Sequence, residues 1–148
     1  MNMLMRLNHA FIAYTSHIPQ SLLLLGGRLA IAAIFYLSAR TKIDGFMIKD
    51  STYFLFEHEY ALPLISPVIA AILATLAEHI FSALLAIGFA TRLSALGLLG
   101  MTLTIQIFVY PGAWATHGIW AVSLIMLLKY GGGTLSIDHL LSKRFMKA

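Results

Sequence analysis

The chain has no cysteine and very little charge. Among its 148 residues there is no cysteine, and Asp, Glu, Lys and Arg together make up 11%. The absence of cysteine excludes disulfide bonds, thiolate metal ligands and every thiol–disulfide mechanism, including the passage of electrons from a cysteine pair to quinone. Any redox role must therefore use a bound cofactor or a partner protein.

Apolar residues take the place of the missing charge. They make up 59% of the chain, and the mean hydropathy is +0.85. Soluble domains contain about 45–50% apolar and about 25% charged residues. A soluble protein of this size could not cover so much apolar surface with polar groups, so the composition predicts a membrane protein that contacts lipid.

Four apolar segments come close to the roughly 20 residues that a helix needs to cross a bilayer core of about 30 Å. They cover residues 20–39, 67–89, 93–110 and 114–130. No soluble linker or low-complexity stretch separates them. We therefore expect a single domain over residues 1–148, folded as an all-α integral membrane four-helix bundle.

Two segments outside these spans also carry a structural signal. The connection from Asp50 to Pro67 is rich in aromatic and aliphatic residues, so we expect an ordered outer loop that folds back onto the mouth of the bundle. Before Pro19, apolar residues recur at helical spacing, which predicts an N-terminal interfacial helix on the membrane surface. These residues are Leu4, Leu7, Phe11 and Tyr14.

Lysine and arginine in the connections predict the orientation. The connection between the third and fourth spans, PGAWATHG, has neither residue, and acidic residues offset the basic ones in the first connection. The remaining basic residues flank the opposite ends of the spans: Arg6, Arg92, Lys129, Lys143, Arg144 and Lys147. We expect both termini in the cytoplasm. No basic stripe with interleaved aromatics is present, so nucleic acid is not an expected partner.

Two charged residues interrupt the apolar spans. A charge near the bilayer centre costs about 2.5–3.5 kcal/mol on insertion scales and usually finds a partner inside the bundle. Counting about 1.5 Å per residue, Arg28 and Glu78 lie roughly 12 and 15 Å from the cytoplasmic ends of antiparallel spans. We predict that they form a buried ion pair. A purely structural pair that sets helix register fits the same residues.

Polar and aromatic residues gather toward the outer side of the bundle. Under the aromatic loop they would form a pocket suited to a small amphipathic ligand. The candidate ligand pocket comprises Arg40, Lys42, Glu57, His58, His79, Gln106, Tyr110, Trp114 and His117. Each also has a plainer interpretation as a snorkelling anchor, an interfacial aromatic or a solvated loop residue. No metal site is expected, because consecutive residues such as 57–59 rarely reach one ion and no ligand spacing supports it.

Several short motifs occur in a specific order. An arginine early in the first span is followed by an apolar run that reaches Lys42, the second span carries Ala77-Glu78 and leaves through Gly88-Phe89-Ala90-Thr91-Arg92, and GGGTLSID closes the series. In these features, the chain resembles the DoxX family of small four-helix bacterial membrane proteins over residues 27–138. Ser38-Ala39 departs from the serine–glycine or histidine–glycine often found there in the family, which puts a transferred pocket geometry in doubt.

The resemblance implies an oxidoreductase, or a membrane subunit of a redox system, in the bacterial inner (cytoplasmic) membrane. Three functions stay open. The first is a quinone-handling or redox-complex subunit, with quinone as ligand and a membrane or soluble redox protein as partner. The second is a non-catalytic assembly or metal- and oxidative-stress partner, docking proteins or its own copies through the small-residue faces at 26–27 and 97–100. The third is a small transporter or proton relay that uses Glu78 and His79.

Overall fold

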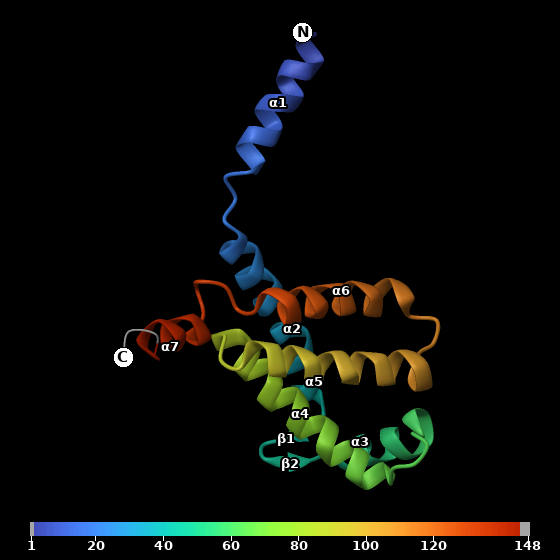
Figure 1. The fold of residues 1–148 in the computed structure, drawn as a ribbon. Coiled ribbons are helices and arrows are strands. Elements are labelled where there is room, and N and C mark those ends of the chain that lie inside the picture. Colours follow the sequence, from blue (N-terminus) through green and yellow to red (C-terminus); the bar gives the residue numbers. More distant parts are fainter. Residues whose placement is uncertain (1, 146–148) are drawn as a thin grey trace.

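The computed structural model describes residues 2–145, and nearly all of its regular structure is helical (Figure 1). Lys147, used above to predict the orientation, lies outside the described residues. In chain order the elements are α1 (Met3–Thr15), α2 (Gln20–Thr41), β1 (Ile43–Asp44), β2 (Met47–Ile48), α3 (Asp50–Leu55), the π-helical segment η1 (Phe56–Tyr60), α4 (Pro67–Ile87), α5 (Thr91–Thr104), the π-helical segment η2 (Ile105–Val109), α6 (Trp114–Tyr130) and α7 (Ile137–Phe145). The predicted helical class is confirmed, apart from one short hairpin.

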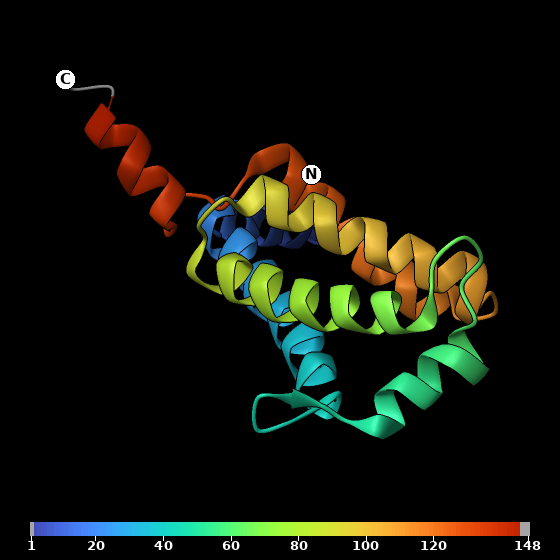
Figure 2. The ribbon, with the colours of Figure 1, turned by 90° about the horizontal axis from the view of Figure 1, so that it is seen from below.

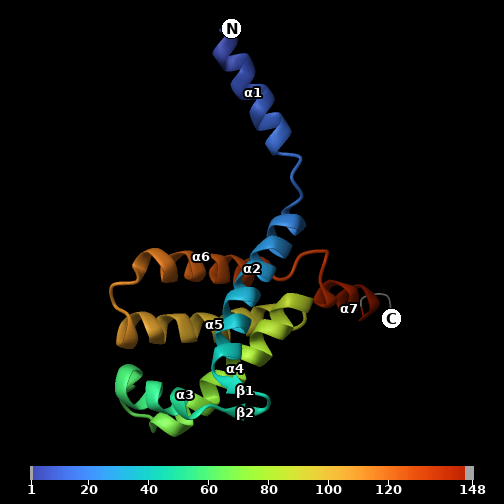
Figure 3. The same ribbon diagram turned by 180° about the vertical axis from the view of Figure 1, so that it is seen from behind.

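The long helices α2, α4, α5 and α6 pack around a common core. Helix α2 contacts α4 and α6, and α5 contacts the same two helices. Helices α5 and α6 run side by side, whereas α2 crosses them steeply (Figures 1 and 3). From below, α4 is seen alongside α5 (Figure 2). The buried apolar side chains that hold these helices together include Leu24, Ile31, Phe35, Leu85, Leu98, Leu124 and Leu127.

The outward faces of the same helices are apolar as well. Leu29, Leu73, Leu96, Ile107 and Val122 are 49–69% exposed. Monomeric soluble proteins rarely leave apolar patches of this extent in contact with water. These apolar faces are therefore suited to contact with lipid.

Three stretches of helix are long and apolar enough to cross a membrane: Gln20–Thr41, Pro67–Ile87 and Thr91–Val109, the last counted through η2. They lie within two residues of three predicted spans at every end. Helix α6 has the predicted bounds, Trp114–Tyr130, but its 17 residues fall short of the roughly 20 that a crossing needs. A fourth membrane span therefore stays a prediction.

Local chemistry explains the ends of α4. The Ser66 hydroxyl accepts a hydrogen bond from the Ile69 N–H at 3.5 Å, and Pro67 occupies the first turn, where a missing N–H costs nothing. Gly88 ends the helix with a φ of +72°, a left-handed conformation that favours glycine. Ala90 then adopts a φ of +48° just before α5. A tight turn therefore joins α4 to α5.

The connection between α2 and α4 is folded, as predicted. Strands β1 and β2 pair antiparallel, and α3 and η1 contact α4. Phe56, only 2% exposed, packs against Ala70 and Ala71. The Thr52 hydroxyl donates to the Lys42 carbonyl at 2.9 Å, which ties α3 to the end of α2.

Helix α1 projects away from the other helices (Figure 1). None of its residues is buried, and Leu4, Leu7 and Phe11 are exposed. An unpartnered apolar side of this kind is what an interfacial helix would offer to lipid. Its position on a membrane surface stays a prediction.

Candidate functional site

A buried ion pair joins the end of α2 to the middle of α4. Lys42 Nζ lies 2.7 Å from Oε2 and 3.0 Å from Oε1 of Glu78, and it also donates to Ser38 Oγ at 2.9 Å. Ser38 Oγ donates to Glu78 Oε1 at 3.3 Å. Lys42 is 6% and Glu78 3% exposed. Removing either partner would leave an uncompensated buried charge, so the two act as a unit.

The predicted Arg28–Glu78 pair is wrong, because the helix register differs from the predicted one. Ser38, not Arg28, lies opposite Glu78, and Arg28 lies beside Gly88. The ten residues from Glu78 to Gly88 correspond to about 15 Å along α4. The depth estimate placed the start of α2 level with the end of α4, whereas Arg28, well inside α2, lies beside Gly88, where α4 ends. Side chains on a helix lean toward its N-terminus, which returns the Lys42 amine to the level of Ser38.

Arg28 is buried in a separate polar environment. It is 1% exposed, and its Nη2 donates to the Leu135 carbonyl at 2.6 Å. Its Nε and Nη1 have no hydrogen-bond partner among the described residues. A Cβ added at Gly88 would collide with Nη1 and lie 2.6 Å from Ser136 Cβ, so a larger residue there would force the guanidinium and Ser136 to shift. Arg28 therefore ties α2 to the segment that follows α6.

A cavity of about 500 Å³ opens beside the Lys42–Glu78 pair, between α2, η1, α4, α5–η2 and α6. Most of its wall is apolar, with side chains that include Ile34, Phe35, Phe56, Leu62, Leu73, Met101, Val109 and Trp120. Its polar groups come from Ser38, Lys42, Tyr60, Glu78, Thr104, Tyr110 and His117. The combination of apolar walls and a few convergent polar groups is typical of small-molecule sites.

A hydrogen-bonded chain sets the chemistry of His117, which is 6% exposed. Gln106 Nε2 donates to the Pro111 carbonyl at 2.7 Å, which turns its Oε1 toward His117 Nδ1 at 2.8 Å. Because an amide oxygen accepts hydrogen bonds, Nδ1 carries the proton, an assignment that follows from the network. In the neutral ring, Nε2 is then an acceptor and is the nitrogen left for a ligand in the cavity.

Two tyrosines line the cavity near the connection between α5 and α6. Tyr60 and Tyr110 meet edge to face, with ring centroids 6.1 Å apart, and the Tyr110 hydroxyl donates to Glu59. This hydrogen bond, more than burial, raises the pKa of Tyr110 above its ordinary value. Burial, with the charges of Glu78 and Glu59, raises the pKa of Tyr60. Both phenols therefore remain protonated at neutral pH, and since the Tyr110 proton is donated to Glu59, Tyr60 is the phenolic donor left for a ligand.

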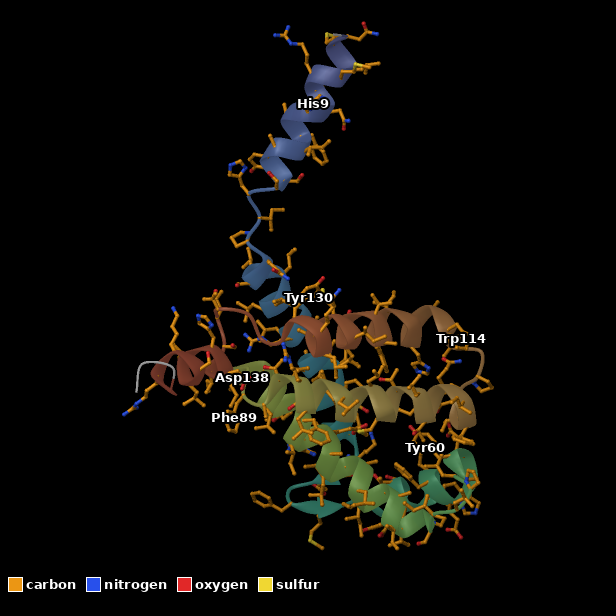
Figure 4. The ribbon with its side chains drawn as sticks, viewed as in Figure 1. His9, Tyr60, Phe89, Trp114, Tyr130 and Asp138 are labelled. Atoms are coloured by element: carbon orange, nitrogen blue, oxygen red, sulfur yellow. The ribbon has the colours of Figure 1, made fainter. Side chains whose placement is uncertain are left out.

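The structure brings Lys42, Tyr110 and His117 together on the cavity wall, and Gln106 supports His117 from behind. Four other candidates lie elsewhere: Arg40, Glu57, His58 and Trp114 are exposed and do not line the cavity. Figure 4 shows Trp114 where α6 begins, well separated from Asp138 and Phe89. Arg40 lies about 200° around the helix from Lys42, so these two side chains point to different sides of α2.

His79 follows Glu78 in sequence but turns away from the cavity. Its Nδ1 lies 2.8 Å from the Thr75 carbonyl, and its ring meets Tyr36 edge to face with centroids 6.0 Å apart. Its Nε2 is buried without a partner among the described residues. The roughly 100° between successive helical residues explains why Glu78 and His79 do not converge.

Sequence reasoning missed Ser38, Phe35 and Trp120 as parts of the site. For Ser38 a signal existed, since it precedes Lys42 by four residues and so shares its helical face. Phe35 and Trp120 pack edge to face with centroids 5.6 Å apart. No sequence pattern distinguished these aromatic residues from ordinary core residues, because their contact depends on how α2 meets α6.

Both small-residue faces considered for docking, at 26–27 and 97–100, are partly packed against side chains of the same molecule. A Cβ at Gly97 would collide with the Phe81 ring, and one at Gly27 would lie 3.2 Å from Met126 Cε. A Cβ added at Gly26 or Gly100 would meet nothing within 4 Å, but Gly100 lines the cavity. Close packing between helices therefore explains much of the small-residue pattern.

No cluster of three or more metal-binding side chains is found within residues 2–145. Glu57 and His58 are exposed, and His58 Nδ1 lies 3.1 Å from the Phe54 carbonyl. Glu59 is engaged by Tyr110. These three neighbours thus have separate surroundings.

The DoxX family model matches residues 23–111, more than half of the chain. The chain belongs to the DoxX family. The match to DoxX takes in most of α2, the folded connection between α2 and α4, α4, α5 and both partners of the Lys42–Glu78 pair, and it ends before α6. Comparison with curated proteins and with solved structures returned no match.

Proposed function

We propose that this DoxX membrane protein binds a quinone in the cavity beside Lys42 and Glu78, as the quinone-handling subunit of a membrane redox system. The observation that carries this proposal is an ion pair, less than a tenth exposed, in the wall of an apolar cavity of about 500 Å³. Ligand pockets typically measure about 300–1,000 Å³. A quinone ring and the start of its apolar tail fit such a space.

The polar groups of the cavity suit the oxygens of a quinone or quinol head group. Tyr60 supplies a phenolic donor for a quinone carbonyl, while the Tyr110 hydroxyl, which donates to Glu59, can accept a hydrogen bond. Glu78 Oε2 and His117 Nε2 supply acceptors for the hydroxyls of a quinol, since a carboxylate oxygen retains a lone pair beside Lys42. The cavity therefore offers hydrogen bonds to both oxidation states.

The proposed role is to hold and orient the head group, with the electrons supplied by a partner protein. The chain has no cysteine, so a thiol pair of its own cannot be the electron donor. An apolar cavity reached from surrounding lipid would concentrate a lipid-soluble carrier. The partner would then need only to dock near the open end of this cavity.

The proposal includes a topology: α6 as the fourth span, both termini in the cytoplasm and the 43–66 segment outside the bacterial inner membrane. Single-cysteine labelling tests it without background, because the natural chain has no cysteine. Phe46→Cys at the hairpin tip and Ser142→Cys in α7 are both at exposed positions. In whole cells, an impermeant maleimide should label the first variant and leave the second unlabelled; the reverse pattern excludes this orientation.

Intrinsic fluorescence tests quinone binding. The chain has two tryptophans: Trp120 lines the cavity and Trp114 lies outside it. In Trp114→Phe, a short-tailed ubiquinone should quench the remaining Trp120 emission saturably, whereas in Trp120→Phe the quenching should be much weaker. Equal, unsaturable quenching in both variants would show that quinone only partitions into the detergent.

A carboxyl substitution then tests the assigned site. Glu78→Gln should raise the Kd for quinol by about tenfold or more, which is the effect of losing a hydrogen bond to a charged group. Glu57→Gln, at an exposed position outside the cavity, is the matched control. His117→Leu provides a second disruption where Glu78→Gln lowers the folded yield. Unchanged affinity in both cavity variants would refute the proposal.

A further inference from the structure

A second hollow, of about 640 Å³, lies at the other end of the helices, where α2, α5 and α7 begin. The glycine-rich segment 131–134 borders it. Tyr130 and Asp138 mark this end of the molecule in Figure 4, away from Tyr60 and Trp114. Polar groups make up a larger share of the lining of this hollow than of the cavity's.

One anionic group already occupies part of this end. The two carboxylate oxygens of Asp138 accept hydrogen bonds from the Ala90 N–H at 2.8 Å and the Thr91 N–H at 2.9 Å. The start of a helix presents free N–H groups and a partial positive charge, which favour such an anion. The Asp138 carboxylate is thus held by α5, while other donors of the hollow are left free.

Two residues in the lining of the hollow, Thr91 and His139, have buried polar atoms without a hydrogen-bond partner among the described residues. Thr91 is 0% exposed, yet its Oγ1 has no hydrogen-bond partner among the described residues. It points toward the glycine-rich segment, since a Cβ added at Gly132 would lie 2.8 Å from it. Nε2 of His139 is also buried and unpartnered within this part of the chain. A buried hydroxyl without a partner is costly and calls for an explanation.

The backbone of the glycine-rich segment adds further donors. The Gly131 N–H donates to the Leu127 carbonyl at 2.8 Å, and the Thr134 N–H donates to Ser21 Oγ at 3.1 Å. The N–H groups of Gly132 and Gly133 have no acceptor among the described residues. Successive free N–H groups in a glycine-rich turn form a concave site for anions.

The charge around the hollow is positive on balance. Arg92 lines it directly. The Arg28 guanidinium lies close to Ser136, because a Cβ added at Gly88 would collide with both side chains. Against these two arginines stands Asp138, whose oxygens already accept from the α5 backbone. An additional anion would therefore enter a favourable potential.

We propose that this hollow binds a phosphate group, held by Arg92, Thr91 Oγ1 and the N–H groups of Gly132 and Gly133. A phosphate has several acceptor oxygens that can engage such scattered donors, and glycine-rich turns at helix N-termini are well suited to it. The phosphate belongs to an anionic phospholipid head group or to a free phosphate ester. The hollow lies at the end of the membrane-crossing helices, where both sources have access.

Thermal unfolding of the full chain in neutral detergent tests the site and its source. One arm compares inorganic phosphate with chloride at equal ionic strength. The other compares mixed micelles containing dioleoyl phosphatidylglycerol with micelles containing dioleoylglycerol, which lacks the phosphate. A rise in Tm with phosphatidylglycerol alone assigns the site to lipid, and a rise with phosphate assigns it to a free anion. No rise in either arm overturns the proposal.

Two variants test the assigned donors. Arg92→Gln should weaken phosphate binding by about tenfold or more. Thr91→Val should raise the Tm of the unliganded protein by removing an unpartnered buried hydroxyl, yet reduce the response to phosphate. Arg40→Gln, an exposed arginine outside both hollows, is the matched control. A full response in both Arg92→Gln and Thr91→Val would contradict the proposed site.

Discussion

The two ends of the helices bury charge in different ways. Beside the cavity, Lys42 and Glu78 neutralise each other directly through side chains. At the opposite end, Arg28 donates to a backbone carbonyl, and Asp138 accepts from backbone N–H groups. The first arrangement needs two matching side chains, whereas the second needs a particular course of the backbone. We therefore expect the two ends to respond differently to substitution.

The largest effect is expected at the side-chain pair. Glu78→Ala should lower the free energy of unfolding by about 3–5 kcal/mol, because it leaves Lys42 charged and buried. The double variant Lys42→Met/Glu78→Leu should recover most of this loss, since it buries no charge. Thermal unfolding in detergent micelles provides the measurement. If Lys42→Met/Glu78→Leu loses as much stability as Lys42→Met and Glu78→Leu combined, the two residues do not act as a pair.

A smaller effect is expected at the backbone-supported end. Gly88→Ala should destabilise the protein by about 1–2 kcal/mol from its left-handed φ alone, with a further cost because the new Cβ would displace Arg28. Gly118→Ala is the matched control, since nothing lies within 4 Å of its Cβ position in α6. Gly118→Ala should leave the stability of the protein unchanged or raise it slightly. Similar Tm values for both variants would show that Arg28 does not depend on Gly88.

The smallest effect is expected at the exposed edge of the cavity. The hydrogen bond to Glu59 raises the Tyr110 pKa, so its stabilisation is present below the ordinary tyrosine pKa of about 10 and is lost as pH rises through the raised value. Absorbance titration of wild type and Tyr110→Phe should differ by one phenol that ionises late. Glu59→Gln should return that ionisation toward the ordinary range. An identical late phase in the wild type and Tyr110→Phe would assign it to another tyrosine.

The boundaries of the helices were accessible from sequence because they depend on local residues. Pro67 begins α4, and Gly88 and Gly131 end α4 and α6, through constraints that lie in their own backbone. The folding of the segment between α2 and α4 was predictable because its apolar residues favour burial. The helix crossing was not, and the wrong partner for Glu78 followed from that.

Composition and periodicity by themselves determined that this is an apolar, helical membrane protein with a polar cluster near one end. Hydrophobic runs and turn residues act over a few positions, so a linear reading captures them. Only the tertiary structure decided that Lys42 meets Glu78, that Gln106 sets the proton on His117, and that Thr91 faces Gly132. These contacts depend on the tilt and register of helices distant in sequence. A displacement of about 15 Å along one axis changes every partner while leaving each helix intact.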